Sequence, residues 1–282
     1  MKQGILVIAL SVLLASCYTP RYMYSPTAQN VPVLVKAGDS KLAATYSTDL
    51  SWLPTDNSNG DNNRERRNGY DLQGAVAVTN NFALQVNYAK RTEFNNDSDN
   101  YRDSTGIRYN RRLAEFGLGY FRSIHRRDKV LFQVFAGMGT GRSEFTDKGK
   151  DFNNVFYERH HQADMLKVYV QPAIIFRPRE NFVLSVSSKL NFINFRNIKT
   201  DYTDVELDDY QLNDLAYGSR TFWEPAFTNS FGFNKLPGVR FEYQFAVALL
   251  VSDRHIDYRS FNFGIGLMLD IPKMFKSTKT PE

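Results

Sequence analysis

Apolar and polar residues alternate along most of this chain, and polar connections separate the alternating segments. In the clearest segment, every second residue from Phe241 to Val251 is apolar, while the alternate positions from Arg240 to Ala248 are Arg, Glu, Gln, Ala and Ala. A second row of this kind runs from Phe261 to Leu269. Because successive side chains of a strand point to opposite faces, each row predicts a strand with one apolar surface.

This alternation predicts ten strands. Their expected ranges are 40–51, 70–79, 82–92, 112–123, 129–142, 164–177, 181–195, 221–233, 239–251 and 259–271. Two of them are irregular. Pro172 removes a ladder hydrogen bond from its strand, where we expect a bulge, and Asn229 interrupts the apolar row of another. Eight or twelve strands are the alternatives if these regions are assigned wrongly.

The connections between the predicted strands alternate in length. Those at 79–81, 125–128, 178–181 and 234–238 are tight, those at 52–69, 93–111, 143–163 and 196–220 are long and polar, and the last, 252–258, is intermediate. Short periplasmic turns and long external loops are typical of small outer-membrane β-barrel proteins, which this chain resembles. The fold class predicted is all-β: a transmembrane, antiparallel, up-and-down barrel of about ten strands.

The less apolar face of the strands indicates a lumen. It is largely Gly, Ala, Ser and Gln, whereas a soluble β-sandwich usually presents Lys, Glu and Thr to water. Five charged residues on this face are expected to form a polar network inside the barrel: Glu115, Lys167, Lys189, Arg240 and Glu242. The alternating glycines of 137–141 are expected to admit a bulky neighbour. A periplasmic, lipid-tethered β domain is the alternative fold.

The chain begins with Met1-Lys2 and an apolar run from Ile5 to Leu14, which is shorter than the roughly 20 residues of a spanning helix. Leu14-Ala15-Ser16-Cys17 follows and resembles the lipobox of bacterial lipoproteins. The resemblance implies that Cys17, the only cysteine, carries a covalent diacylglycerol and an N-acyl chain such as palmitate. It also implies sorting to the outer membrane, since Tyr18 is not the aspartate that retains lipoproteins in the inner membrane.

Four regions are therefore expected. They are a lipoprotein signal peptide (1–16), a lipidated periplasmic tether with three prolines (17–38), the outer-membrane barrel (39–271) and a polar periplasmic tail (272–282). Both ends of the mature chain are predicted to be periplasmic.

Composition agrees with a membrane barrel. Aromatic residues reach 14%, although 23% of the chain is charged, and aromatic girdles at the membrane interfaces give this combination. The net charge of +5 is spread among acidic residues and predicts no nucleic-acid partner. No cofactor is expected apart from the lipid on Cys17.

The sequence contains four histidines as starting points for enzymatic chemistry. His125 lies in a predicted turn, and the adjacent His160 and His161 would point to opposite faces of a strand, which disfavours a metal site. His255 lies between Asp253 and Asp257 in the last external hairpin. Omptin-type surface proteases, which are ten-stranded barrels, place an Asp–His pair opposite an Asp–Asp pair at the barrel mouth. The facing carboxylates would come from Asp201, Asp204, Asp208 and Asp209, but no motif fixes that geometry.

The sequence therefore predicts a non-enzymatic barrel with a structural or interaction role exerted through long polar external loops. Its expected partners are outer-membrane lipid, lipopolysaccharide and an unidentified envelope protein. A narrow pore and an omptin-like surface hydrolase are the alternatives. Ten strands leave little free interior, since eight enclose only side chains and porins have 16 or more, so conductance is predicted to be negligible.

Overall fold

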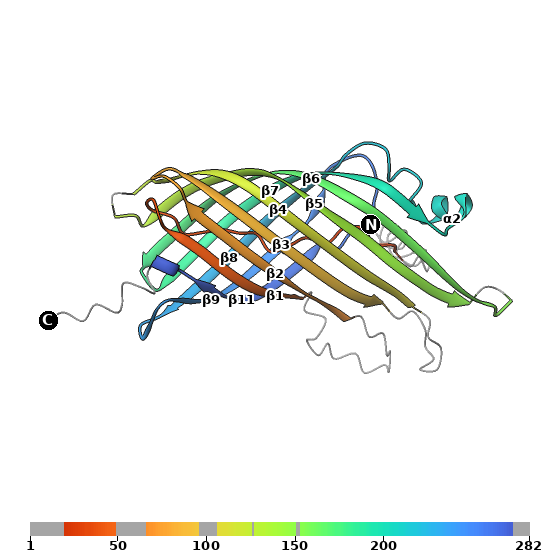
Figure 1. The fold of residues 1–282 in the computed structure, drawn as a ribbon, viewed down its shortest axis with the longest axis horizontal. Helices are drawn as coiled ribbons and strands as arrows, with labels where there is room; N and C mark the ends of the chain where they lie inside the picture. Colours follow the sequence, from red (N-terminus) through yellow and green to blue (C-terminus); the bar gives the residue numbers. More distant parts are fainter. Residues whose placement is uncertain (1–19, 49–65, 96–105, 126, 151–152, 273–282) are drawn as a thin grey trace, which may run out of the picture.

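The computed structural model describes residues 20–48, 66–95, 106–125, 127–150 and 153–272. These residues form a tilted sheet that curves into a barrel, with one short helix at one end (Figure 1). The strands are β1 (Ser40–Thr48), β2 (Arg66–Ala77), β3 (Phe82–Asn95), β4 (Gly106–Ser123), β5 (Val130–Lys150), β6 (Phe156–Arg179), β7 (Phe182–Thr200), β8 (Arg220–Phe233), β9 (Leu236–Val247), β10 (Leu249–Leu250) and β11 (Phe261–Leu269), and the helix is α2 (Asp204–Asp209). No helix in the described ranges is long and apolar enough to cross a membrane.

The sheet is closed, because its first strand pairs with its last. Each strand from β1 to β9 is hydrogen-bonded to the next in antiparallel orientation, and β11 joins β9 to β1. The closing seam runs in unbroken register from Leu42↔Leu269 to Thr48↔Phe263. The two-residue β10 pairs only with β8. It continues β9 along the same edge of β8, so β9 and β10 count as one strand of the barrel. The structure is therefore a ten-stranded antiparallel barrel, which leaves no unpaired sheet edge.

All ten predicted strands are present, but several extend further than their apolar rows. β5 and β6 continue as a paired ribbon to Lys150↔Phe156, through most of the predicted long connection 143–163. The expected bulge at Pro172 is wrong: pairing with β7 pauses there and resumes in the same register, from Val170↔Leu190 to Ala173↔Ser187. Ladder pairing tolerates a missing N–H without inserting a residue, and that accounts for the unbroken register.

The two faces of the barrel differ sharply in polarity. Outward side chains form an apolar band, in which Leu118 and Met138 are 59% and 62% exposed. Inward positions of the strands are buried and largely polar, as at Gln85 and Gln171. This arrangement is the inverse of a soluble barrel, in which the apolar face would be inside. It suits hydrocarbon around the barrel and polar groups within it.

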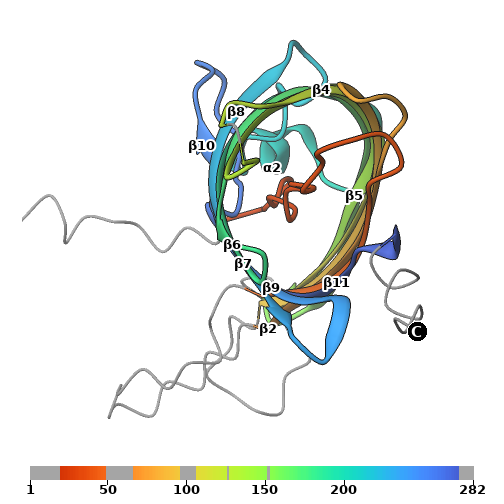
Figure 2. The same ribbon diagram turned by 90° about the vertical axis from the view of Figure 1, so that its left-hand side faces the viewer.

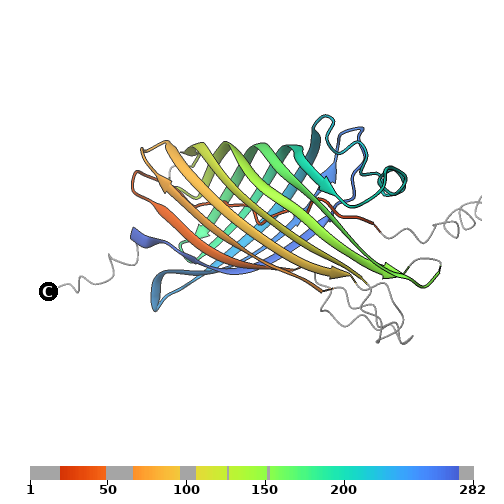
Figure 3. The ribbon, with the colours of Figure 1, turned by 45° about the vertical axis from the view of Figure 1, so that its right-hand side comes forward.

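Residues 20–38, here called the lumen segment, run through the inside of the barrel. In the end-on view they lie inside the ring of strands (Figure 2), and in the oblique view they run lengthwise through the barrel (Figure 3). Arg21, Tyr24, Asn30 and Leu34 are all at most 4% exposed. The segment reverses at Gly38, whose positive φ of 85° suits glycine, and the chain then enters β1.

The direction of the lumen segment is defined by its contacts at both ends. Near its start, the Arg21 backbone N–H donates to Asp257, which lies in the connection between β10 and β11. Near its end, the Ala37 N–H donates to Asn80, in the tight turn between β2 and β3. The segment thus enters at the end of the barrel with the long connections and leaves at the end with the short turns.

This path corrects two expectations. The described part of 17–38 is not a tether outside the barrel, because inward-facing amides and charges bind it inside. Nor do the two ends of the described chain lie together: Arg21 is among the long connections, whereas the Asp270 N–H donates to Gly238 beside the turn after β8. Figure 1 shows the C-terminal end of β11 at the short-turn end.

Small inward residues make room for large ones, as predicted for the glycines of 137–141. A Cβ on Gly137 would lie 2.8 Å from the Tyr169 hydroxyl oxygen, and one on Gly139 would lie 2.9 Å from Cγ of Glu115. At Gly119 a Cβ would overlap the ring of Phe135, which is fully buried. Close packing inside the lumen therefore depends on glycine at these positions.

We expect Gly119→Ala to lower the free energy of unfolding by about 1–3 kcal/mol, because the added methyl overlaps the Phe135 ring. Urea unfolding of the barrel folded into lipid vesicles, followed by fluorescence, measures the change. Gly232→Ala is the matched control, since a Cβ there meets nothing closer than 3.3 Å. Equal losses from both variants would contradict the packing argument, and Gly119→Ala/Phe135→Leu should recover part of the loss.

Candidate functional site

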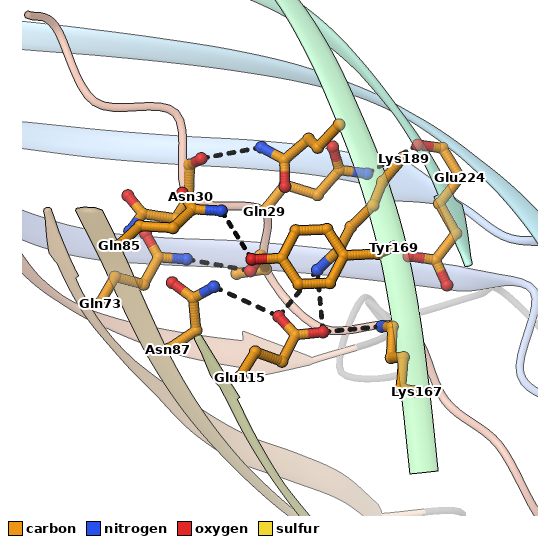
Figure 4. A network of polar contacts seen from close by, with 12 residues as sticks. Gln29, Asn30, Gln73, Gln85, Asn87, Glu115, Lys167, Tyr169, Lys189 and Glu224 are labelled. Atoms are coloured by element: carbon orange, nitrogen blue, oxygen red, sulfur yellow. Dashed lines mark hydrogen bonds and ion pairs between the residues drawn. The ribbon is translucent and has the colours of Figure 1, made fainter. Parts of the chain in front are cut away.

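The lumen is the most elaborate polar site of the described structure, and a buried carboxylate lies at its centre. Glu115 of β4 accepts from Lys167 of β6 at 2.9 Å and from Lys189 of β7 at 2.7 Å, and these three side chains are at most 2% exposed (Figure 4). Asn87 of β3 also donates to Glu115 at 3.2 Å. These residues meet because each occupies a position of its strand whose side chain points into the lumen.

The lumen segment completes this cluster. Two lysines and one glutamate would leave a net positive charge, but Tyr24 links Lys167 to a second carboxylate. The Tyr24 hydroxyl donates to Glu224 at 2.5 Å, and the Lys167 ammonium donates to the same hydroxyl oxygen at 3.3 Å. With Glu224 included, the buried charges balance, as burial of ions requires.

Barrel amides bind the backbone of the lumen segment in its middle. The Gln29 N–H donates to the Gln244 side chain at 2.6 Å, and the Gln244 amide donates back to the Gln29 carbonyl at 2.9 Å. Gln73 donates to the Ala28 carbonyl at 3.0 Å, and Gln171 donates to the Asn30 carbonyl at 2.8 Å. An extended peptide is thus hydrogen-bonded on several sides by the glutamines that the sequence places on the inward face.

A second charged layer closes the long-connection end. The Arg21 guanidinium donates to Asp147 at 2.6 Å, and Tyr202 donates to the same oxygen at 2.8 Å. Burial and the nearby Asp147 carboxylate raise the pKa of Tyr202 well above its ordinary value, so that it stays a neutral donor. Close by, Glu93 accepts from both Arg111 and Arg259, at 2.6 and 3.0 Å.

The five predicted lumen residues do not form a single network. Glu115, Lys167 and Lys189 are in direct contact, as described above. Glu242 instead pairs with Lys41 of β1 at 3.0 Å, and Arg240 donates to Ser230 and to the Glu180 carbonyl near the short-turn end. The alternation of the sequence thus predicted correctly that all five side chains point inward. It did not predict the partners of Glu242 and Arg240.

The loop residues considered for catalysis are not assembled into a site. Asp257 accepts from the Arg21 N–H at 2.7 Å and so holds the lumen segment, while Asp253 and His255 are exposed. His161 is buried and stacks on Phe145, whereas the ring of His160 points out to Thr146 and Glu158. Within the described residues, no group of three or more His, Cys, Asp or Glu side chains could hold a metal ion.

Sequence reasoning missed the lumen segment, including Arg21, Tyr24 and Gln29. One signal was available: the inward positions are largely small residues, and these alone do not fill a ten-stranded lumen. The segment itself has no alternation and contains three prolines, which favour a linker interpretation.

Together, the closed sheet, its apolar outer band and its polar, filled interior define the class of protein: a small β-barrel of the outer-membrane type. No family model matches the chain, and no curated protein matches it. Solved outer-membrane barrels resemble it only in fold.

Three of these structures illustrate the likeness. Ail, the attachment invasion locus protein of Yersinia pestis, is 11% identical, with a TM-score of 0.31, and the match covers 83% of this chain and 99% of Ail. OprG of Pseudomonas aeruginosa is 12% identical, with a TM-score of 0.35 and coverages of 85% and 98%. The Escherichia coli outer membrane protease OmpT is 11% identical, with a TM-score of 0.38 and coverages of 83% and 94%. Identities and scores this low carry no argument about activity.

We expect Glu115→Ala to lower the free energy of unfolding by about 3–5 kcal/mol, because Lys167 and Lys189 would remain buried without their shared carboxylate. Urea unfolding in lipid vesicles measures the loss, and heat-modifiable migration on a gel measures the folded fraction. Glu158→Ala is the control: it breaks an ion pair with Lys148 whose side chains are nearly half exposed, and should cost less than about 1 kcal/mol. The importance of the buried cluster is refuted if the two losses are alike.

Proposed function

We propose that this chain is a non-enzymatic outer-membrane β-barrel lipoprotein whose lumen is closed by its own N-terminal segment. Its role is structural or is exerted through the connections at its open end, with outer-membrane lipid, lipopolysaccharide and an envelope protein as partners. The observation that carries the proposal is the lumen segment, which occupies the space that a pore or a substrate would need. The apolar outer band supports the membrane location.

Two features favour a closed barrel over a narrow pore. The backbone of the lumen segment is hydrogen-bonded by amides from several strands, and the charged layer around Asp147 and Glu93 lies at the long-connection end. A passing ion would have to move past these contacts. The segment is nevertheless joined to the barrel wall only by non-covalent contacts before Gly38, so substitutions can loosen it.

An omptin-like hydrolase receives no support from the arrangement of the loops. A water-activating site needs a base within hydrogen-bond reach of the water and a carboxylate that orients it. Here Asp257 is occupied by the lumen segment, and His255 is exposed with no side-chain partner among the described residues.

We predict that the wild-type barrel in a planar lipid bilayer shows no stable open level of roughly nanosiemens size. The variant Arg21→Ala/Tyr24→Phe/Gln29→Ala removes the side-chain hydrogen bonds of Arg21 to Asp147, of Tyr24 to Glu224, and of Gln29 to Ser187 and the Glu224 carbonyl. It alters no strand and should give brief openings. Lys36→Ala, at an exposed position of the same segment, is the control and should stay closed. A steady open level in the wild-type protein would rule out closure by this segment.

The proposed orientation places the long connections outside the cell and the short turns in the periplasm, as in other outer-membrane barrels. Pro20 then lies at the outer end, where its carbonyl accepts from the Tyr109 hydroxyl at 2.8 Å. Cys17 is three residues earlier, and three extended residues span at most about 11 Å. Lipid attached to Cys17 would therefore be delivered on the outer side of the membrane, while the C-terminal end stays periplasmic.

This topology is tested with two epitope tags, one inserted between Tyr18 and Thr19 and one added after Glu282. On intact cells we expect an antibody to reach the first tag and to reach the second only after permeabilisation. A first tag that is hidden until permeabilisation would contradict the outward path. Palmitate labelling of the wild type and of Cys17→Ser tests lipidation separately, so that a missing lipid is not mistaken for a wrong topology.

A further inference from the structure

Four basic side chains lie in one row across neighbouring strands on the outer face of the barrel. Lys90 of β3 pairs with Arg112 of β4, and Arg112 pairs with Arg142 of β5. Asp164 of β6 follows, and next to it lies Arg196 of β7. Their inward neighbours, such as Ala89 and Leu113, are buried, which shows that these charges point outward. We call Lys90, Arg112, Arg142 and Arg196 the cationic row.

Like charges in directly opposed positions of neighbouring strands destabilise a sheet, because their Cβ atoms are only about 5 Å apart. The row has one internal counter-charge. Asp164 accepts from the Arg142 Nε at 2.8 Å, and its other oxygen accepts from Asn197 at 3.0 Å. The side chains of Lys90, Arg112 and Arg196 have no acceptor in the described parts of the chain. Three positive charges thus face outward and lack a partner.

A groove of about 490 Å³ opens between these arginines. Arg112, Arg142 and Arg196 line it together with apolar or aromatic side chains, among them Tyr88 and Leu166. A site of this make-up suits a ligand that is anionic on one side and apolar on the other. Asp164 also lines the groove, but both its oxygens are already hydrogen-bonded, which reduces its repulsion of an anion.

The apolar band begins one to two outward positions from the row, on the side of the short turns. The next outward positions along β4, β5 and β7 are Ala114, Thr140 and Asn194, and the positions after these are Phe116, Met138 and Phe192, which are 47%, 62% and 39% exposed. A molecule whose anionic group occupies the groove can therefore lay long apolar chains against the band without leaving the barrel surface. A free inorganic anion would use only the first of these features.

We propose that the cationic row binds the phosphate group of an acylated, phosphorylated glycolipid in the outer leaflet. The location in the outer leaflet rests on the proposed orientation, in which the long connections face outward. Arginine suits this role because its planar guanidinium donates two parallel hydrogen bonds to phosphate oxygens. Bound phosphate would supply the missing counter-charge for Arg112 and Arg196, and the acyl chains would pack on the apolar band.

The variant Arg112→Gln/Arg196→Gln tests the site and leaves the Arg142–Asp164 pair intact. The matched control is Arg108→Gln/Arg122→Gln, which removes two exposed arginines of β4 on either side of the row. Native mass spectrometry of the full chain in detergent, titrated with bisphosphorylated lipid A, measures binding. We expect the first variant to bind about tenfold more weakly or worse, as expected for lost charge-assisted hydrogen bonds, and the control to bind like the wild type.

Two further ligands separate lipid binding from anion binding. Lipid A without its phosphates should bind about tenfold more weakly to the wild type, and millimolar inorganic phosphate should not displace the phosphorylated lipid. Equal binding of both lipids, or equal loss in both variants, would overturn the proposal, as would displacement by inorganic phosphate alone. Because the assay is done in detergent, it does not depend on the orientation, lipidation or conductance proposed above.

Discussion

Burial of polar side chains inside a closed sheet is the constraint on which this structure depends. A barrel with an apolar exterior must direct its amides and charges inward, and each of them needs a partner once the lumen excludes water. Strand-to-strand contacts satisfy only part of this demand. The lumen segment supplies further partners: carbonyls for Gln73 and Gln171, and a hydroxyl between Lys167 and Glu224. Fold and closure are therefore two results of one requirement.

The same requirement explains why the segment that precedes β1 runs the length of the barrel. It joins the charge layer around Arg21 and Asp147 to the central cluster around Glu115, and then turns at Gly38 into the first strand. Its covalent connection to β1 keeps its local concentration high, so modest hydrogen bonds suffice to hold it. As a result, the N-terminal and C-terminal ends of the described chain lie at opposite ends of the barrel.

The barrel could be predicted from the sequence because a two-residue period is a local signal. Rows such as Phe241 to Val251 identify both a strand and its outward face, and parity then places Glu115, Lys167 and Lys189 inside. The partner of Glu242 could not be predicted in this way, since Lys41 belongs to β1 and reaches Glu242 of β9 past the intervening β11. The lumen segment was missed for the same reason: its hydrogen bonds go to distant strands, and its prolines suggest a linker.

The hydrogen bonds between the barrel wall and the lumen segment have a consequence for how the segment's sequence can change in evolution. Around residues 28–30, barrel glutamines mostly bind the main chain, which every amino acid possesses. Drift at Ala28 should thus be tolerated more readily than drift in the glutamines, as long as size permits, whereas Gln29 and Asn30 are also held by their side chains. The wall is therefore a sleeve for an extended polypeptide that is selective at some positions and permissive at others.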